Sequence, residues 1–274
     1  MRASDAESAE CAALIGKIRT KRPIIHHNTN YVTANDCANI TLAIGASPIM
    51  ADDPREAEAV TGSAHALVLN MGTPSPARIE AAMISGRTAN AIGIPVVFDP
   101  VGIGVSDFRA GAAREILGAV ACAVIRCNAS EILSLANGSP GAGLDATEAE
   151  RAANICQIAK TEATKYKCVV VVTGASDVVT DGERTTLVLN GHESMSGITG
   201  TGCMCDSVIA SFCATGANPF TAAICGTACM GMAGEMAFER TGCLGTGSLR
   251  AAIFDAMSGM TGKVFGERMR LSGI

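Results

Sequence analysis

Short apolar runs alternate with segments of helical periodicity along the whole of this chain. The inner runs are continuous in apolar residues, which is typical of strands covered on both faces of a parallel sheet. We therefore predict a layered α/β domain in which helices flank a central, mostly parallel sheet. The predicted strands are residues 23–26, 65–70, 94–99, 121–127 and 168–174, with a hairpin-like pair around Asp181-Gly182.

Several predicted helices have recognisable first residues. Asp53-Pro54, Ser75-Pro76 and Asn218-Pro219 each place a capping side chain before a proline that suits the first helical position. Residues 147–150, with the sequence TEAE, form a capping box that predicts a helix running towards residue 165. The glycine-rich stretch 138–143 in front of it is predicted to be a loop.

Size and composition narrow the class of protein. A length of 274 residues without a linker-like stretch predicts a single domain spanning residues 1–274. Although 48% of the residues are hydrophobic, the apolar runs, such as 168–172, are short and fall far below the roughly 20 residues that a bilayer span needs. Acidic residues precede the first apolar segment, which is the wrong order for a secretory signal, so we expect a cytoplasmic protein with no membrane partner.

The charge distribution argues against a nucleic-acid partner. The net charge of −5 arises from interspersed acids and bases rather than from a tail. Aromatic residues make up 3% of the chain and tryptophan is absent, which leaves little surface for base stacking. We therefore expect small molecules as partners.

The 12 cysteines are scattered through apolar positions, among them Cys37, Cys122, Cys156, Cys168 and Cys225. We predict that most of them are small core residues in a reducing compartment. No pair has the C-x-x-C spacing, and only four histidines are available as further ligands. A structural zinc site is therefore disfavoured.

The strongest local signal is a glycine-rich turn, Thr199-Gly200-Thr201-Gly202-Cys203, that leads directly into an apolar helical pattern. Such a turn exposes backbone N–H groups at a helix N-terminus, where the helix dipole also favours an anion. It predicts a site for a phosphate or a developing phosphoryl charge, although similar turns also simply join a loop to a helix. Cys203 lies where the dipole lowers the pKa of a thiol and makes it usable as a base, the alternative being a small buried side chain.

Acidic side chains follow two neighbouring predicted strands. Asp99 ends one apolar run, and Glu131 closely follows the next. Ligands collect outside the carboxyl ends of parallel strands, and two acids there suit Mg²⁺, which takes one or two carboxylates plus substrate phosphates. For each acid alone, helix capping or a surface ion pair is the alternative. Thr173 ends a third strand, at a position suited to hydrogen-bonding a nucleotide phosphate.

The sequence also excludes some arrangements. The chain has neither a Walker G-x-x-x-x-G-K-[ST] loop nor a strand-linked G-x-G-x-x-G fingerprint. The adjacent His26 and His27 point to opposite faces of a predicted strand, so they cannot form one catalytic pair.

Taken together, these segments resemble the hydroxyethylthiazole kinase family of the ribokinase-like superfamily, from about residue 23 to residue 247. Several anchors in this order are far more specific than any one of them. The anchors are Thr29-Asn30-Tyr31-Val32-Thr33, Gly45-Ala46-Ser47-Pro48-Ile49-Met50, Ala66-Leu67-Val68-Leu69-Asn70-Met71-Gly72-Thr73, Asp99-Pro100-Val101-Gly102, Arg126 with Asn128-Ala129-Ser130-Glu131, Thr173-Gly174, Asn190-Gly191-His192 and Gly200-Thr201-Gly202-Cys203.

The resemblance implies a fold, an assembly and a reaction. The fold would be the ribokinase-like three-layer arrangement, assembled as a homotrimer with active sites between subunits. The reaction would transfer the γ-phosphoryl group of ATP to the primary hydroxyl of 4-methyl-5-(2-hydroxyethyl)thiazole, a salvage step of thiamine biosynthesis.

The resemblance also implies nucleotide and metal contacts. Asn128-Ala129-Ser130-Glu131 matches the superfamily's N-x-x-E motif, which organises Mg²⁺ around the phosphates, and Asp99 would belong to the same metal and water network. Arg126 and Thr173 look like the contacts to the ATP phosphates.

The implied alcohol pocket involves four residues. Met50 and Gly200 resemble contacts to the thiazole, and Asn30 and Thr33 would lie near the same pocket. The chain departs from the usual family pattern at His27-Asn28, which would reshape this pocket.

The implied mechanism centres on Cys203. Most sugar kinases of the superfamily have aspartate at this position, so a cysteine resembles the thiazole-kinase branch. Cys203 would act as the base near the substrate hydroxyl, while the amides of Gly200, Thr201, Gly202 and Cys203 stabilise the transferring phosphoryl group. Asp206 is a further acid that would face the same side of the helix, or would merely be solvated.

Other readings stay open at the level of the sequence. Another ribokinase-like kinase, acting on a hydroxymethylpyrimidine or a pyridoxal-like alcohol, and a dehydratase of nicotinamide hydrates have the same fold. A catalytically silent nucleotide-binding or regulatory protein is the alternative from a different class. The presence of Asp99, Glu131 and Cys203 disfavours a silent protein.

Overall fold

The computed structural model describes residues 3–137, 148–242 and 244–273. Nine strands of this part form one sheet in the order β2-β1-β3-β4-β5-β6-β7-β8-β9. Neighbours from β2 to β6 run parallel, and β7, β8 and β9 extend the sheet in antiparallel fashion. The strands are β1 Ile24–Asn28, β2 Ser47–Met50, β3 Ala66–Asn70, β4 Val96–Asp99, β5 Val124–Asn128, β6 Val169–Thr173, β7 Asp177–Thr180, β8 Thr185–Val188 and β9 Leu271–Gly273.

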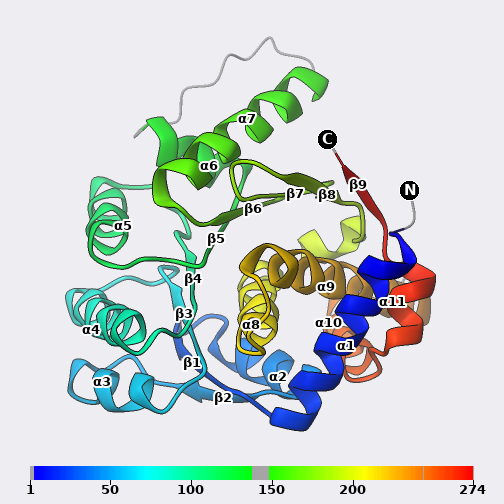
Figure 1. Ribbon diagram of the computed structural model, residues 1–274, viewed down its shortest axis with the longest axis horizontal. Helices are drawn as coiled ribbons and strands as arrows, with labels where there is room; N and C mark the ends of the chain where they lie inside the picture. Colours follow the sequence, from blue (N-terminus) through cyan, green and yellow to red (C-terminus); the bar gives the residue numbers. More distant parts are fainter. Residues whose placement is uncertain (1–2, 138–147, 243, 274) are drawn as a thin grey trace.

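Helices cover both faces of the sheet, which confirms the predicted three-layer α/β fold (Figure 1). One layer contains α3 Pro54–Gly62, α4 Pro76–Ile92, α5 Asp107–Ala119, α6 Ala129–Asn137 and α7 Glu148–Tyr166. The other contains α1 Asp5–Lys21, α2 Ala34–Ile44, α8 Thr201–Cys213, α9 Pro219–Thr241, α10 Thr246–Ser258 and α11 Gly262–Arg268, with the short 3-10 helix η1 Glu193–Gly197 beside α9. None of the helices in the described ranges combines the length and the apolar character that a membrane crossing requires.

The sheet separates two apolar cores because successive side chains of a strand point to opposite faces. On β4, Val97 belongs to the core under α8 and α9, whereas Phe98 belongs to the core under α4 and α5. Small residues let α8 and α9 pack closely: a Cβ on Gly226 would lie 2.7 Å from Cγ1 of Ile209. Burial on both faces explains why the inner strands are unbroken apolar runs.

Most of the predicted elements are confirmed. The five parallel strands and the hairpin lie within one to three residues of their predicted positions. Each of the three predicted capping residues accepts a hydrogen bond from a backbone N–H in the first turn of its helix. The predicted loop 138–143 and Thr147 of the predicted capping box lie outside the described residues.

The sequence patterns do not predict β2 and β9. Pro48 lies within β2, and proline normally argues against a strand. Here β2 is the edge of the sheet, where a missing backbone N–H is tolerated. β9 has only three residues, which is too short for a periodic pattern.

His26 and His27 point to opposite faces of β1, as predicted. The ring of His26 lies 2.9 Å from Oγ1 of Thr61 on α3, and the ring of His27 lies 3.1 Å from Oγ of Ser207 on α8. Burial lowers the pKa of His26, and it lowers that of His27 to about 4. Both rings are therefore neutral partners within the packing of the sheet and not a catalytic pair.

Two of the cysteines are linked, although unlinked core cysteines were predicted. Cys11 on α1 and Cys225 on α9 form a disulfide, so the prediction of unlinked core cysteines is wrong for these two residues. The nine free cysteines of the described part are buried, apart from the half-buried Cys156, as predicted. The disulfide joins positions 214 residues apart and ties the N-terminal helix to the core layer.

The disulfide can be tested by counting thiols. We expect the denatured, unreduced protein to take up two equivalents of an alkylating reagent fewer than the 12 cysteines of the chain, and the reduced protein to be fully labelled. Loss of such a long-range link typically costs about 2–4 kcal/mol of stability, so reduction is also expected to lower the melting temperature. Intact mass after alkylation measures the first effect. A Cys225→Ser control should be labelled equally with and without reductant, and equal labelling of the unaltered chain would contradict the assignment.

Candidate active site

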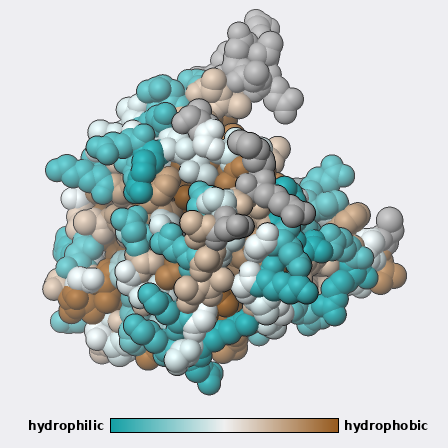
Figure 2. All heavy atoms as spheres, turned by 45° about the vertical axis from the view of Figure 1, so that its right-hand side comes forward, coloured by the Kyte–Doolittle hydropathy of each residue, from teal (hydrophilic) through white to brown (hydrophobic). Residues whose placement is uncertain are grey.

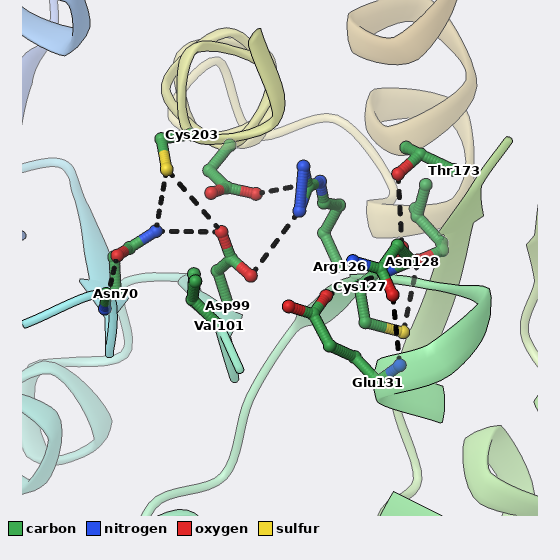
Figure 3. A network of polar contacts seen from close by, with 12 residues as sticks. Asn70, Asp99, Val101, Arg126, Cys127, Asn128, Glu131, Thr173 and Cys203 are labelled. Carbon is green, nitrogen blue, oxygen red and sulfur yellow. Dashed lines mark hydrogen bonds and ion pairs between the residues drawn. The ribbon is translucent and has the colours of Figure 1, made fainter. Parts of the chain in front are cut away.

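Polar side chains collect at the carboxyl edge of the parallel strands (Figure 3). Asn70 ends β3 beside Asp99, which ends β4; Asn128 ends β5 beside Thr173, which ends β6. The N-terminus of α8, at Thr201, faces this edge. Because the parallel strands all end on the same side, segments far apart in the sequence meet here.

Cys203 lies within a hydrogen-bonded group that contains Asn30, Asn70 and Asp99. Asn70 Nδ2 donates to Asp99 Oδ2 at 2.7 Å and lies 3.2 Å from Cys203 Sγ. Asn30 Nδ2 donates to Asn70 Oδ1 at 2.8 Å and lies 3.5 Å from the same sulfur. Asp99 Oδ2 lies 4.0 Å from Sγ. The sulfur is thus held between two amide donors and a carboxylate, and Figure 3 shows its contacts with Asn70 and Asp99.

The pKa of the Cys203 thiol is raised, not lowered. Burial has the largest effect, and the charge of Asp99 adds to it. Hydrogen bonds with Thr33 and Asn70 and the charge of Arg126 lower the pKa without offsetting these effects. The expectation from the helix dipole is therefore wrong in direction, and Cys203 is a neutral thiol at neutral pH.

The guanidinium of Arg126 lies between two buried carboxylates. Its Nη1 is 3.4 Å from Asp99 Oδ1, and its Nε is 3.5 Å from Asp206 Oδ1. Asp206 is fully buried, so the alternative of a solvated acid is wrong, and it faces the same side of α8 as Cys203, as predicted. Burial opposes the charge on Arg126, but the two acids together raise its pKa well above the usual value. Nη2 fills the space beside Gly202, where a Cβ would clash with it.

Glu131 accepts two backbone hydrogen bonds at the start of α6. Its Oε1 accepts from Gly102 N at 2.8 Å and its Oε2 accepts from Asn128 N at 2.9 Å. Asn128 Oδ1 in turn accepts from Glu131 N at 3.0 Å. Glu131 therefore does cap the start of α6, which was the alternative to a metal role, and the capping bonds fix its carboxylate at the strand edge. Burial, followed by the charge of Asp99, raises the pKa of Glu131.

Asp99 and Glu131 are the carboxylates at this edge that could hold a divalent cation. The mutual repulsion that raises the pKa of Glu131 would be relieved by a cation near both acids, so Asp99 and Glu131 fit Mg²⁺ chemistry. Within the described residues, the group of potential ligand atoms that lie within 4.8 Å of one another is Asp99, Cys203 and Asp206, and Glu131 is outside it. Arg126 already provides a cation between the two aspartates of that group.

A cavity of about 720 Å³ opens beside Arg126. Its size falls within the range of small-molecule sites. The predicted phosphate contacts Arg126 and Thr173 both line it, together with the first turn of α8 at Thr201 and Gly202. Thr173 Oγ1 donates to Cys127 O at 3.2 Å, so its hydroxyl would have to rotate to donate to a phosphate oxygen. The remaining lining residues are Asn128, Gly174, Ala175, Asp177, Asn190, Gly191, His192, Glu193, Met195, Ser196, Cys205, Thr227, Met230 and Gly231.

Three of the four predicted alcohol contacts lie together next to Cys203. Asn30 Oδ1 accepts from the backbone N of Thr33 at 3.0 Å and from its Oγ1 at 3.1 Å. Gly200 has φ +90°, and a Cβ there would lie 2.6 Å from Cγ2 of Thr33, so glycine is required on both grounds. Met50 takes no part in these hydrogen bonds and lies at the exposed end of the edge strand β2.

Asn70 was not singled out from the sequence as a site residue, although it bonds both Asp99 and Cys203. A signal for it is present, because Asn70 is the polar residue that ends an apolar strand, as Asp99 is. The same strand-end argument would have found both residues.

Comparison with known proteins identifies the family of this chain. The model of the hydroxyethylthiazole kinase family matches residues 15–263. A hydroxyethylthiazole kinase of Ruminiclostridium cellulolyticum is 49% identical over 95% of this chain and 96% of its own length, and one of Clostridium beijerinckii is 44% identical over 97% and 98%.

Solved structures agree with this assignment. A hydroxyethylthiazole kinase structure from Pyrococcus horikoshii OT3 matches with a TM-score of 0.89 and 31% identity over 97% of this chain and 99% of that one. A ribokinase-like superfamily protein of Enterococcus faecalis matches with a TM-score of 0.61 at 11% identity, which shows a shared fold alone. The chain therefore belongs to the hydroxyethylthiazole kinase family and has the ribokinase-like fold.

Proposed function

We propose that this chain transfers the γ-phosphoryl group of ATP to the primary hydroxyl of 4-methyl-5-(2-hydroxyethyl)thiazole, as a salvage step of thiamine biosynthesis. The observation that carries the proposal is the meeting of Arg126 and the first turn of α8 at the wall of one cavity, with Asp99 in contact with both Arg126 and Cys203. Transfer between ATP and an alcohol needs a cation, anion-binding amides and a proton acceptor in one place.

The cavity beside Arg126 is the proposed ATP site. Arg126 provides a permanent positive charge and Thr173 provides a hydroxyl oxygen at its wall. The nucleoside would extend towards Asn190 and His192, which line the same cavity. The position of Arg126 at the cavity wall supports its assignment as a phosphate contact.

The first turn of α8 is the proposed site of the transferring phosphoryl group. The first backbone bond of the helix runs from Met204 N to Gly200 O, so the amides of Thr201, Gly202 and Cys203 have no acceptor within α8. These amides and the helix dipole would stabilise the negative charge that shifts during transfer. Glycines at positions 200 and 202 keep side chains out of this space.

Cys203 is proposed to take the proton of the substrate hydroxyl. Its sulfur lies next to the residues assigned to the alcohol pocket, Asn30 and Thr33. Because the thiol is neutral, its own proton would pass to Asp99 Oδ2, 4.0 Å from the sulfur, and the thiolate so formed would take the hydroxyl proton. Phosphoryl transfer depends mainly on positioning and electrostatics, so a modest base suffices.

Mg²⁺ is proposed to be held by Glu131 and Asp99, and it would neutralise charge on the ATP phosphates. Glu131 is fixed by its two backbone hydrogen bonds, and Asp99 is fixed by Asn70. These contacts prearrange both carboxylates before the metal and the nucleotide bind.

A homotrimer with active sites between subunits is also proposed. The segment that carries the buried Asn30 and Thr33 exposes the two apolar side chains between them, with Tyr31 72% and Val32 58% exposed. Met50 is also 38% exposed. Apolar side chains grouped beside a polar pocket favour coverage by another subunit. The cytoplasmic location and the absence of a nucleic-acid partner stay predictions.

The activity is tested by coupled ADP release from purified protein with MgATP. We expect turnover with hydroxyethylthiazole and little with hydroxymethylpyrimidine or pyridoxal, and loss of turnover when EDTA removes the metal. Preference for pyridoxal or hydroxymethylpyrimidine would move the assignment to another kinase of this fold. ATP binding without turnover of any acceptor would favour a silent nucleotide-binding protein.

Gly202→Ala tests the phosphate role of Arg126. The new Cβ would occupy the place of Nη2, so the guanidinium must move, and a misplacement of this size is expected to raise KM for ATP about tenfold or more. Gly118→Ala on α5 is the matched control, because a Cβ there meets nothing within 4 Å. Unchanged ATP kinetics in a folded Gly202→Ala protein would remove Arg126 from the phosphate site.

Cys203→Ala tests the base. Removal of a general base is expected to lower kcat about 100-fold while the dissociation constant of ATP changes little, because the base acts in the chemical step. Single-turnover rates and equilibrium ATP binding separate the two effects. Cys213→Ala, a buried change at the other end of α8, controls for packing. Equal turnover of the Cys203→Ala and unaltered proteins would exclude the thiol from the mechanism.

A further inference from the structure

Asp206 is a buried acid that the proposed mechanism does not use. It lies one turn after Cys203 on α8 and is fully buried. Among the described residues, neither of its carboxylate oxygens has a hydrogen-bond partner. Arg126 is its oppositely charged neighbour: Nε lies 3.5 Å from Oδ1, an ion-pair contact without hydrogen-bond geometry, and the carboxylate of Asp99 is also close. A carboxylate in this setting costs stability unless it is paired, so the contact to Arg126 is the one that offsets its burial.

The guanidinium of Arg126 is held from three directions. Nη1 faces Asp99 (Figure 3), Nε faces Asp206, and Nη2 fills the space that Gly202 leaves beside α8. With a single carboxylate partner, the planar guanidinium could still rotate about the line that joins the two groups. Two carboxylates on different nitrogens define the plane of the guanidinium as well as its position.

Asp206 can accept from Nε of Arg126 in either protonation state. Burial, followed by the charge of Asp99, raises the pKa of Asp206, and the charge of Arg126 lowers it. Whether or not the acid carries a proton, an oxygen remains that can accept from Nε.

We propose that Asp206 is a positioning residue, which fixes Nε of Arg126 so that the guanidinium stays against the first turn of α8 and faces the phosphates of the nucleotide. This inference rests on the proposed role of Arg126 at the phosphate site. Asp206 would touch neither ATP nor the alcohol, and it would act through Arg126 alone.

The direction of the effect separates positioning from simple charge. An acid beside the phosphate site repels an anion, so loss of Asp206 through charge alone would strengthen phosphate binding or leave it unchanged. Loss of positioning weakens it. If Asp206 is a positioning residue, Asp206→Ala should weaken phosphate binding, whereas the loss of its charge alone would strengthen that binding or leave it unchanged.

The experiment measures equilibrium binding of inorganic tripolyphosphate and of adenosine by calorimetry. In Asp206→Ala we expect tripolyphosphate to bind about tenfold more weakly, by analogy with other misplaced catalytic groups, and adenosine to bind as it does to the unaltered protein. Ser211→Ala is the matched control, since Ser211 is a buried polar residue of the same helix whose hydroxyl donates only to Ser207 O. It should leave both ligands unaffected. Unchanged or tighter tripolyphosphate binding, or an equal loss for adenosine, would overturn the proposal.

A double-mutant cycle with Arg126→Lys shows whether Asp206 acts through the guanidinium. Lysine keeps the charge but has a single amine that cannot face both acids, so Arg126→Lys alone should also weaken tripolyphosphate binding. Adding Asp206→Ala to it should then cost little more, whereas additive losses would mean that Asp206 acts by another route. If Asp206→Ala does not fold, the Arg126→Lys variant decides alone: unchanged tripolyphosphate binding would overturn the proposal. Binding is measured without turnover, so a chain that failed the ADP-release test could still support this role.

Discussion

Arg126 is a permanent cation enclosed by protein, and the arrangement of the active site depends on how its charge is balanced. Burying an unpaired guanidinium would destabilise the fold by far more than one contact stabilises it, because arginine does not lose its charge at accessible pH. The chain balances it with Asp99 from a neighbouring strand and Asp206 from α8. The same requirement explains Gly202, since any side chain there would occupy the space of the guanidinium.

The parallel sheet brings these groups together because its strands end at the same edge. Asn70, Asp99, Asn128 and Thr173 each end a strand, and their register places them side by side in pairs. Helix α8 then adds amides and Cys203 from the layer that covers one face of the sheet. Strands buried on both faces are apolar along their length, so the polar residues of such a fold gather at strand ends, and ligands bind there.

Local signals in the sequence predict local features well. Unbroken apolar runs predicted the inner strands, and proline after a capping residue predicted helix starts. The polar residues at and just after the strand ends predicted Asp99, Glu131 and Thr173 as site residues. Features that depend on distant partners were not predicted. The sequence left open whether Asp206 faces the site or is solvated, and it did not indicate the contact with Arg126. Cys11 and Cys225 are 214 residues apart in sequence. The edge strand β2 contains a proline that only its edge position permits.

The raised pKa of Cys203 fits the chemistry better than the lowered pKa expected from the helix dipole. A thiolate at the N-terminus of α8 would place an anion where the phosphoryl group is proposed to bind, and the two would repel each other in a site of low dielectric. Burial and the charge of Asp99 keep the thiol neutral and leave the anion site free. The amides of Asn30 and Asn70 still face the sulfur, so they would stabilise the thiolate that forms when the thiol proton passes to Asp99. The two opposing influences thus suit a thiol that is neutral while ATP binds and becomes a base only when its own proton leaves during transfer.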